Sequence, residues 1–584
     1  MNQLKQAAAK AILTKIGMLA DANGTANANA LSTDDIAGMF EYPPDPKMGD
    51  LAFPCFKLAK TLRQAPPKIA AALADGLSVD GISDIQVVGG YLNLFVDQSG
   101  MAKNTLDAIL AQKEAYGGSE EGKGKTVVLD YSSPNVAKPF HIGHLGTTVI
   151  GHSLKKLHAF CGYTCVGINH LGDWGTQFGK MIVAYKKWGD RETVERGECD
   201  ALVELYVKFH EEAEKDPSLN DEARAVFTEM EHGNPEYMEL WKWIKEISLR
   251  EYEKTYRQLG ITFDSYAGES FYTDKMPAVV EELKEKNLLK IDDGASIIDL
   301  SDYNMPPCLI LKRDGSTLYP ARDISAALYR KNTYHFDKCI YVTSAGQSLH
   351  FAQWFKVLEL MGYDWAKDQL VHVPYGTVSI DGGKLSTRSG NVVLLRDLFN
   401  QAIEKVSAIM DEKNPNLPDK EKIAESVGVG AIIFYYLSSG RIRDINFVME
   451  DALSFEGNTG PYAQYTYARA SSIVSKAEAA GIVGIDAPID LSGVAVSEEE
   501  NALIKTLALF PDKVKQALHE YEPSVITRYI LDVCADFNRF YHDVQILSCE
   551  DACTRLFRVN LTLAVKYVLG NAFELICIQK NEKI

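Results

Sequence analysis

The sequence lacks the features of membrane-embedded, zinc-ribbon and disulfide-stabilised proteins. No apolar run reaches the length of a membrane span, and the apolar stretch 561–578 is interrupted by Lys566 and Glu574. The ten cysteines include no Cys-x-x-Cys pair, which argues against a zinc ribbon. A chain of 584 residues does not need disulfides to fold. We therefore expect reduced cysteines and a cytoplasmic protein with no membrane segment.

The chain also lacks a surplus of positive charge. Lysine and arginine number 61 against 79 aspartate and glutamate residues, so the formal net charge is -18. This balance argues against broad, nonspecific attraction to polyanions, although a local basic groove remains compatible with it. Residues 1–20 carry spaced lysines among leucine and isoleucine with no continuous apolar core, which predicts an amphipathic helix and not a signal peptide.

The length predicts several domains, because a single core of this size is uncommon. A first α+β unit is expected over residues 1–113, with helices at 4–19, 56–62 and 67–77 and a strand over 85–96. A Gly- and Glu-rich linker at 115–125 follows it.

A strand–turn–helix–strand unit follows this linker. The short apolar run Val127–Leu129 is typical of a buried strand, a helical pattern begins after Gly143, and residues 163–168 form the next strand candidate. Charged amphipathic helices over about 181–260 indicate an insertion. Further strand-like runs lie at 297–300, 308–311, 339–343 and 370–373, with helices expected at 323–331 and 349–361.

From about residue 400 helical periodicity dominates, over 423–437, 462–480, 498–519, 524–543 and 555–578. A helical bundle is the natural interpretation of residues 401–584. The predicted fold is therefore multidomain: a small α+β domain, a Rossmann-like parallel-sheet α/β domain over 114–400 with a helical insertion, and an all-α carboxyl-terminal domain.

Two motifs bear on the chemistry. His141-Ile-Gly-His144 stands at a helix start just after a strand, where parallel α/β sheets bind phosphates. A metal site is disfavoured because no carboxylate or cysteine nearby completes a ligand set; phosphate binding and simple packing remain open. The loop 380–391 places Lys384, Ser386 and Arg388 among glycines, which suits a polyphosphate clamp, although a solvated surface turn is the usual alternative.

Taken together, the motifs resemble class I aminoacyl-tRNA synthetases, whose two signatures are His-Ile-Gly-His and Lys-Met-Ser-Lys-Ser. The closer resemblance is to arginyl-tRNA synthetases and covers nearly the whole chain. It is carried by segments in that family's order: Gly90–Asn93, Ser132–His144, Asn169–Gly179, Tyr319–Asp323, Gly346-Gln347 and Gly457–Tyr462.

This resemblance implies an enzyme of protein biosynthesis that activates L-arginine with ATP and Mg²⁺ to an adenylate, releases diphosphate, and transfers arginine to tRNA(Arg). It implies that His141, Gly143 and His144 bind ATP and that both histidines stabilise charge at the α-phosphate. Lys138 and the loop residues Lys384, Ser386 and Arg388 would hold the outer phosphates.

The resemblance also implies residues for arginine and for RNA. Asp130, Tyr319 and Asp323 would select the guanidinium, and Asn135 and Gln347 would face the backbone end of the amino acid. Without the resemblance, a helix N-cap is the simpler interpretation of Asp323. For tRNA the candidates are Asn93 in the first domain and three residues of the carboxyl-terminal domain, expected to bind the anticodon: Tyr462, Tyr465 and Arg469. At helical spacing such residues are more often core.

The chain departs from the family pattern at two places near the signatures. Gly146-Thr-Thr stands where Arg-Ser-Thr is usual, and the second signature is Lys-Leu-Ser-Thr-Arg. Two alternatives remain: a class I synthetase of different specificity, and a tRNA-binding paralogue without catalysis. We expect a monomer, since no sequence feature calls for a partner surface.

Overall fold

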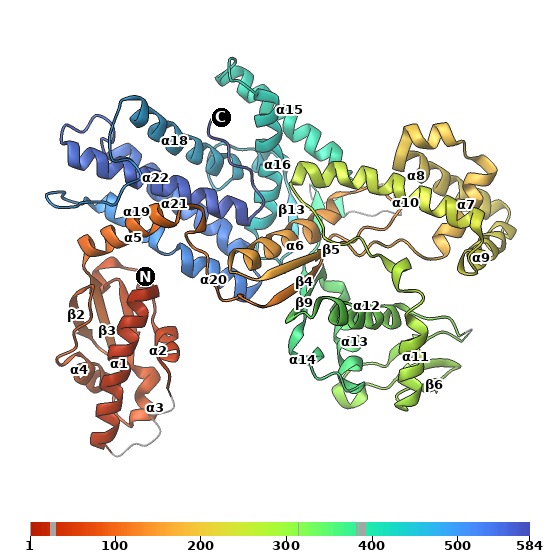
Figure 1. Ribbon diagram of the computed structural model, residues 1–584, viewed down its shortest axis with the longest axis horizontal. Helices are drawn as coiled ribbons and strands as arrows, with labels where there is room; N and C mark the ends of the chain where they lie inside the picture. Colours follow the sequence, from red (N-terminus) through yellow and green to blue (C-terminus); the bar gives the residue numbers. More distant parts are fainter. Residues whose placement is uncertain (1, 24–30, 314, 381–382, 385–392) are drawn as a thin grey trace. The chain divides into compact units, whose positions relative to one another are not determined.

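The computed structural model describes residues 2–23, 31–313, 315–380, 383–384 and 393–584. The chain folds into two compact units that alternate along the sequence (Figure 1). One consists of Met1–Gly117, Arg469–Lys515 and Asp532–Asn571, and the other of Gly118–Ala468, Gln516–Leu531 and Ala572–Ile584. Among the described residues, no helix combines the length and apolar character needed to cross a bilayer.

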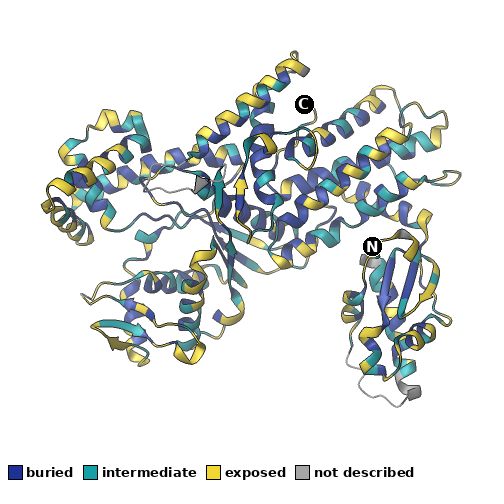
Figure 2. Ribbon diagram, turned by 180° about the vertical axis from the view of Figure 1, so that it is seen from behind, coloured by how far each residue is buried: buried dark blue, intermediate teal, exposed yellow. Residues whose placement is uncertain are grey.

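The amino-terminal part is α+β, as predicted. Its antiparallel sheet has the order β1 (Leu51–Pro54), β3 (Tyr91–Val96), β2 (Ile82–Val88), and β1 and β3 are buried whereas the edge strand β2 is largely exposed (Figure 2). The α-helices of its described residues are α1 (Asn2–Asn23), α2 (Thr33–Met39), α3 (Ala59–Leu62), α4 (Pro66–Ala74) and α5 (Gln98–Gln112).

The single strand expected over 85–96 is wrong, because the chain turns back within it. β2 and β3 form an antiparallel hairpin in which Val88 lies opposite Tyr91. Gly89, at φ 59°, adopts the left-handed conformation that such a tight turn requires. The Gly-Gly pair was the turn signal that the apolar alternation on either side obscured.

The second unit is built on a parallel sheet with the order β10 (Leu370–Tyr375), β9 (Lys338–Ser344), β4 (Thr126–Asp130), β5 (Thr164–Ile168). All three pairings are parallel. After β4 the chain enters α6 (Ile142–Phe160), which leads back to β5. This arrangement confirms the predicted Rossmann-like domain.

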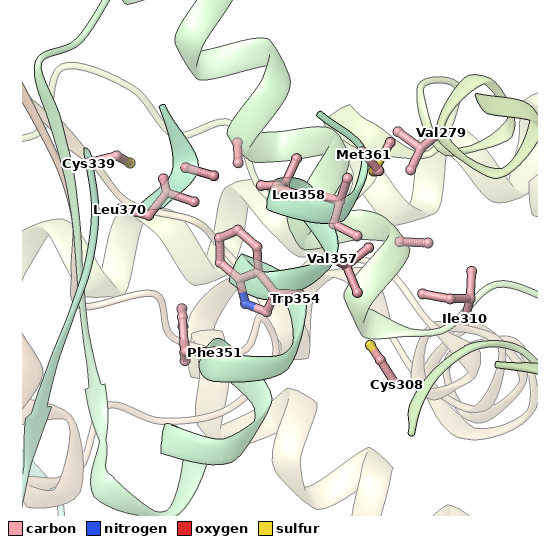
Figure 3. Packing of buried hydrophobic residues seen from close by; sticks show 14 of the residues in the cluster. Val279, Cys308, Ile310, Cys339, Phe351, Trp354, Val357, Leu358, Met361 and Leu370 are labelled. Atoms are coloured by element: carbon pink, nitrogen blue, oxygen red, sulfur yellow. The ribbon is translucent and has the colours of Figure 1, made fainter. Parts of the chain in front are cut away.

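The remaining strand-like runs, 297–300 and 308–311, do not join the parallel sheet. They form a separate antiparallel sheet of β6 (Lys290–Asp292), β7 (Ala295–Ile298) and β8 (Cys308–Leu311). Beside it lie α11 (Met276–Glu285), α12 (Tyr319–Tyr334) and α13 (Ser348–Leu360). Their shared core surrounds the fully buried Trp354, with Phe351, Val357 and Leu358 around it (Figure 3).

The predicted insertion is helical. It consists of α7 (Thr176–Trp188), α8 (Arg191–Lys215), α9 (Ser218–Glu231) and α10 (Pro235–Leu259). These helices enclose a core of their own that includes Phe178, Phe209 and Ile244. The last helix, α10, also contacts the loop after β4 through Tyr252 and Tyr256.

The carboxyl-terminal part is helical, as predicted, with one break that the periodicity did not reveal. The helix expected over 498–519 is two helices, because Pro511, which has no N–H to donate, falls within the first turn of the second. The elements are α15 (Leu395–Lys413), α16 (Lys420–Ser438), β13 (Ile445–Phe447), α17 (Met449–Ala452), α18 (Gly460–Ala479), α19 (Glu498–Ala508), α20 (Phe510–Glu520), α21 (Ser524–Asp543) and α22 (Ala552–Leu575).

Candidate active site

The site lies at the carboxyl end of the parallel sheet. β4 pairs with β9 on one side and β5 on the other, so the chain connections leave in opposite directions at this strand. Asp130, the last residue of β4, stands opposite Tyr341 of β9 and Ile168 of β5. In open α/β sheets such a switch point is where ligands bind.

The loop that follows β4 has a strained backbone. Ser132, Ser133 and Ala137 have φ values of 70°, 49° and 61°, in the left-handed region that side chains with a Cβ disfavour. Such conformations cost about 1–3 kcal/mol each and persist only where the surroundings hold them. Strain concentrated in one short loop is typical of a functional segment.

Four hydrogen bonds from three residues outside this loop hold it. The Ser132 N–H donates to Thr147 Oγ1 (3.1 Å), and the Ser133 N–H donates to Asn169 Oδ1 (3.0 Å). The Tyr252 hydroxyl of α10 lies 2.8 Å from the Asn135 carbonyl oxygen and 2.6 Å from the Lys138 carbonyl oxygen. The side chains of Asn135 and Lys138 are exposed, so the loop presents both outward from a fixed backbone.

The two histidines cap the helix that they begin. His141 is the N-cap residue of α6, and its Nδ1 accepts the Gly143 N–H at 3.1 Å. His144 Nδ1 accepts the His141 N–H at 3.2 Å. A ring nitrogen that accepts a hydrogen bond carries no proton, so both imidazoles hold their proton on Nε2. The capping contacts thus fix one tautomer in each ring.

Electrostatics keep both rings neutral. Burial, followed by the neighbouring His141, lowers the pKa of His144 to about 3. Burial also lowers the pKa of His141, and the Lys138 ammonium lowers it further. Each ring is therefore a neutral Nε2–H donor near pH 7, at a helix N-terminus whose dipole favours anions. Neutral donors at this place fit phosphate oxygens.

The segment after the second signature pairs with the histidine motif through the backbone. The Ile142 N–H donates to the Val393 carbonyl (3.2 Å), the Leu395 N–H donates to the Phe140 carbonyl (2.9 Å), and His141 and Leu394 form an antiparallel bridge. Residues 393–395 directly follow the loop that contains the predicted clamp. The structure therefore brings the residues that follow that loop to the histidine motif.

The beginning of the same loop is a short hairpin. β11 (Val378–Ile380) pairs with β12 (Gly383–Lys384), with Ser379 opposite Lys384. β11 also pairs in parallel with β13. The backbone of Lys384 is thus placed, whereas Ser386 and Arg388 lie outside the described residues.

The departure at Gly146 has a steric cause. A Cβ at this position would lie 2.1 Å from the Tyr436 hydroxyl oxygen and 3.2 Å from Tyr375. Tyr436 belongs to α16, so an aromatic side chain occupies the space into which a larger residue of α6 would extend. The absence of a side chain at Gly146 therefore allows α6 and α16 to pack closely against each other.

The amino-acid side of the site is organised by α12. Tyr319 is its first residue and is 65 % exposed, and Asp323 follows one turn later. The N-cap is Leu318, so the alternative that Asp323 is a helix cap is wrong. His350 Nε2 donates to Asp323 Oδ2 at 2.6 Å. Gln347, one turn before His350, is exposed in the segment that follows β9.

Asp130 is engaged inside the protein. Its Oδ2 forms an ion pair with Arg330 Nη2 of α12 at 2.8 Å, and its Oδ1 accepts the Ser133 hydroxyl at 2.9 Å. The Asp130 side chain is 11 % exposed and that of Arg330 is 1 % exposed. Arg330 was not among the predicted site residues, because nothing in its local sequence distinguishes it from a surface cation of an amphipathic helix.

Glu269 is a second residue that the sequence interpretation missed. The pKa of Glu269 is raised to about 7, chiefly by burial. The Asp173 and Asp323 carboxylates also raise it, and the adjacent Arg322 partly offsets these effects. Its Oε2 lies 3.0 Å from Arg322 Nη1. Glu269 therefore lies close enough to Asp323 to be influenced by its charge. An acidic residue at the start of a short 3-10 helix, Glu269–Tyr272, offered no sequence pattern by which to recognise it.

The predicted tRNA residues have different environments. Asn93 lies in the central strand β3 and is only 5 % exposed. On α18, Tyr465 is 43 % exposed and Tyr462 is partly buried. The Arg469 guanidinium lies 4.8 Å from the centre of the Tyr541 ring and its Nη1 donates to Asn538. All four assignments stay predictions.

Among the described residues no group of three or more His, Cys, Asp or Glu side chains is arranged to hold a metal ion. All ten cysteines are free thiols. The donors gathered here, imidazole N–H groups, ammonium groups and backbone, match an anion and not a metal. Packing accounts for part of the placement of His144, whose ring stacks on the buried Phe140 at 5.0 Å between ring centres, whereas the capping hydrogen bonds tie both rings to the helix start.

Three matches to known protein families cover the chain. The family described as "tRNA synthetases class I (R), catalytic domain" matches residues 105–449, "Arginyl tRNA synthetase N terminal domain" matches residues 2–96, and "DALR anticodon binding domain" matches residues 463–584. The chain belongs to the arginyl-tRNA synthetase family. The resemblance inferred from the motifs and the predicted fold class are both confirmed.

Individual arginyl-tRNA synthetases are similar over nearly their whole length. "Arginine--tRNA ligase" of Alkaliphilus metalliredigens is 52 % identical over 551 residues, 94 % of this chain and 96 % of the relative. The protein of that name from Clostridioides difficile is 51 % identical over 555 residues, 95 % and 97 % of the two chains. The solved Thermus thermophilus arginyl-tRNA synthetase superposes with a TM-score of 0.79 at 25 % identity, covering 93 % of this chain and 96 % of that one.

Proposed function

We propose that this protein is an arginine–tRNA ligase, which activates L-arginine with ATP and attaches it to tRNA(Arg), releasing AMP and diphosphate. The observation that carries the proposal is the pair of neutral Nε2–H donors at the start of α6, joined by backbone pairing to the segment after the second signature. Near-complete similarity to arginine–tRNA ligases supports the choice of amino acid. A class I synthetase of other specificity is not favoured.

The first step is attack of the arginine carboxylate on the α-phosphate of ATP. Negative charge builds on the phosphate oxygens, and donors fixed before the reaction stabilise it most effectively. His141 and His144 would donate there, and the Gly143 backbone would allow close approach of ATP. No acid, base or covalent residue is required, because the substrate carboxylate is already a nucleophile.

Lys138, Lys384, Ser386 and Arg388 would bind the β- and γ-phosphates. Mg²⁺ would enter with ATP as part of that substrate and would be held through its phosphates. Lys138 is exposed next to the histidines, and its charge already acts on both of their pKa values.

Arginine recognition would rest on Asp323, with Tyr319 beside it on α12 and Asn135 and Gln347 toward the backbone end of the amino acid. Glu269 adds a partly ionised carboxylate near Asp323. Asp130 would belong to the same site in a role other than direct contact with the substrate guanidinium, because Arg330 already occupies its carboxylate. Sites built on hydrogen bonds discriminate by about 10⁴–10⁵ without editing, which suits the rejection of lysine.

The domain division that we propose is residues 1–113 for tRNA contact, 114–400 for catalysis and 401–584 for the anticodon. Tyr462, Tyr465 and Arg469 would contact RNA from α18, with Asn93 contributing from the first domain. We propose further that the protein acts as a monomer in the cytoplasm. Light scattering of the purified protein with and without tRNA tests the oligomeric state.

The decisive experiment is ATP–diphosphate exchange with each of the twenty amino acids, with and without tRNA. Exchange driven by arginine alone among them supports the proposal. Exchange driven by a different amino acid identifies a synthetase of other specificity. Absence of exchange even with tRNA(Arg), together with retained tRNA binding, identifies a noncatalytic paralogue. We expect activation to depend on bound tRNA, so exchange without tRNA contradicts that part.

A further inference from the structure

A guanidinium group of the protein itself is buried at the end of β4. Arg330 is 1 % exposed, and its Nη2 lies 2.8 Å from Asp130 Oδ2 and 3.3 Å from His170 Nδ1. The group stands 5.5 Å from the centre of the Tyr341 ring and 6.0 Å from that of Tyr272. Its Nε and Nη1 find no acceptor among the described residues. Asp130 is therefore the main partner that offsets the cost of burying this charge.

The Asp130 carboxylate is held on both oxygens. While Oδ2 faces Arg330, Oδ1 accepts the Ser133 hydroxyl, and Ser133 Oγ in turn accepts the His170 N–H at 3.1 Å. Ser133 is one of the strained residues of the loop that leads to the histidine motif. The ion pair thus anchors the first turn of that loop.

A second carboxylate of the site is also paired with an arginine of α12. Glu269 lies 3.0 Å from Arg322, and the two side chains are 17 % and 14 % exposed. α12 therefore supplies one arginine to Asp130 and another to Glu269. An arginine is permanently charged, so each carboxylate has a cation beside it whenever it is ionised.

Asp323, on the same helix, differs from both. Its partner is the imidazole of His350, which is not a permanent cation. Asp323 and Asp130 both act on the pKa of the buried His170, which burial lowers and the two carboxylates raise. Of these three carboxylates, Asp323 alone forms no ion pair with an arginine among the described residues.

We propose that Arg330 is a positioning residue for substrate recognition: it neutralises and fixes Asp130, so that the substrate guanidinium is directed to Asp323. The buried Arg330 guanidinium repels a second guanidinium from Asp130. Through Asp130 it also fixes the position of Ser133 and of the loop that follows. This inference rests on the proposed function, since it assigns one end of the arginine substrate to one part of that site.

The test compares three variants in tRNA-supported exchange and by calorimetric binding of arginine. Arg330→Met leaves the Asp130 charge uncompensated; it should raise the KM for arginine about tenfold or more, a change that corresponds to 1.4 kcal/mol, and leave the KM for ATP unchanged. The preference for arginine over lysine should fall with it, because the compact lysine ammonium gains an unneutralised carboxylate. Arg330→Lys, which keeps the positive charge, should show a smaller rise in the KM for arginine and a smaller loss of the preference for arginine over lysine.

The double variant Asp130→Leu/Arg330→Met separates recognition from stability. Replacing a buried ion pair with apolar side chains is often neutral for stability, so the melting temperature should return toward that of the unaltered protein while the KM for arginine stays raised. Arg558→Met is the matched control: it removes the cation 2.6 Å from the buried Glu500, in α22 and α19, and should lower the melting temperature without changing either KM.

The proposal would be overturned if the folded double variant had the same KM for arginine and the same preference for arginine over lysine as the unaltered protein. The ion pair would then be structural only. Equal changes in the KM values for arginine and ATP in Arg330→Met would overturn it as well. Failure of the unaltered protein to bind or activate arginine would instead overturn the proposed function, so the two failures are distinguishable.

Discussion

The two halves of the active site are built on opposite electrostatic plans. The half at the start of α6 uses neutral groups, two imidazoles with fixed tautomers at a helix N-terminus. The half around α12 uses buried ions, with Asp130 and Glu269 each beside an arginine. A phosphate brings its own charge and needs donors, whereas a guanidinium needs one uncompensated anion at a defined place. Each half therefore complements the charge of its ligand.

The strongest test of the neutral half removes a donor. His144→Ala should lower the exchange rate by about 10²–10³-fold, equivalent to about 2.7–4 kcal/mol of transition-state stabilisation. Arginine binding measured by calorimetry should change little, because the lost group faces phosphate. His144→Asn, which keeps an N–H donor, should lose less. A similar loss in both variants would contradict the role of the Nε2–H.

The strongest test of the ionic half removes its anion. Asp323→Ala should raise the KM for arginine by more than about 30-fold, since truncating one partner of a buried charge pair costs roughly 2–5 kcal/mol. The KM for ATP should stay nearly constant. Asp274→Ala, at an exposed carboxylate that pairs with the adjacent Lys275, is the control and should change neither value. Equal effects of Asp323→Ala on both KM values would mean that this residue is only structural.

The same contrast explains what could be predicted from the sequence. His141 and His144 follow soon after their strand in the sequence. The apolar periodicity alone is enough to place them just beyond the end of a parallel strand. Arg330 and Glu269 acquire their roles only by meeting Asp130 and Arg322 across long sequence separations, which no local pattern records. The β2–β3 hairpin, the break between α19 and α20 and the separate β6–β8 sheet were missed for a related reason: apolar periodicity does not report chain reversal or which strands pair.

A third test concerns the contact between α6 and α16. Gly146→Ala should destabilise the protein by about 1–3 kcal/mol, because the new Cβ would lie 2.1 Å from the Tyr436 hydroxyl oxygen in a packed site. Denaturant unfolding measures this change. Combining it with Tyr436→Phe should recover part of the loss, since only the nearest atom is removed. If the double variant is no more stable than Gly146→Ala, the hydroxyl is not the obstacle.

The smallest expected effect is a pH dependence confined to the ionic half. The pKa of Glu269 is raised to about 7, chiefly by burial, so this carboxyl is largely neutral at pH 6 and largely ionised at pH 8. Its added negative charge near Asp323 should lower the KM for arginine about 2- to 5-fold as the pH rises between these values, because the adjacent Arg322 screens the charge and limits its contribution to about 1 kcal/mol.

Glu269→Gln should flatten the pH dependence of the KM for arginine. It should leave the pH dependence of the exchange rate unchanged. The unfolding free energy should change with pH in the opposite direction to arginine binding. A carboxyl whose pKa is higher in the folded than in the unfolded protein binds its proton more tightly when folded, so it stabilises the folded state at low pH. Its contribution to the unfolding free energy is therefore present below pH 4.5 and is lost as the pH rises to about 7. Glu269→Gln should remove that part of the slope. The two histidines add a slope of the opposite sign, because their pKa values are lowered in the folded protein and protonation of the unfolded chain below about pH 6.5 favours unfolding.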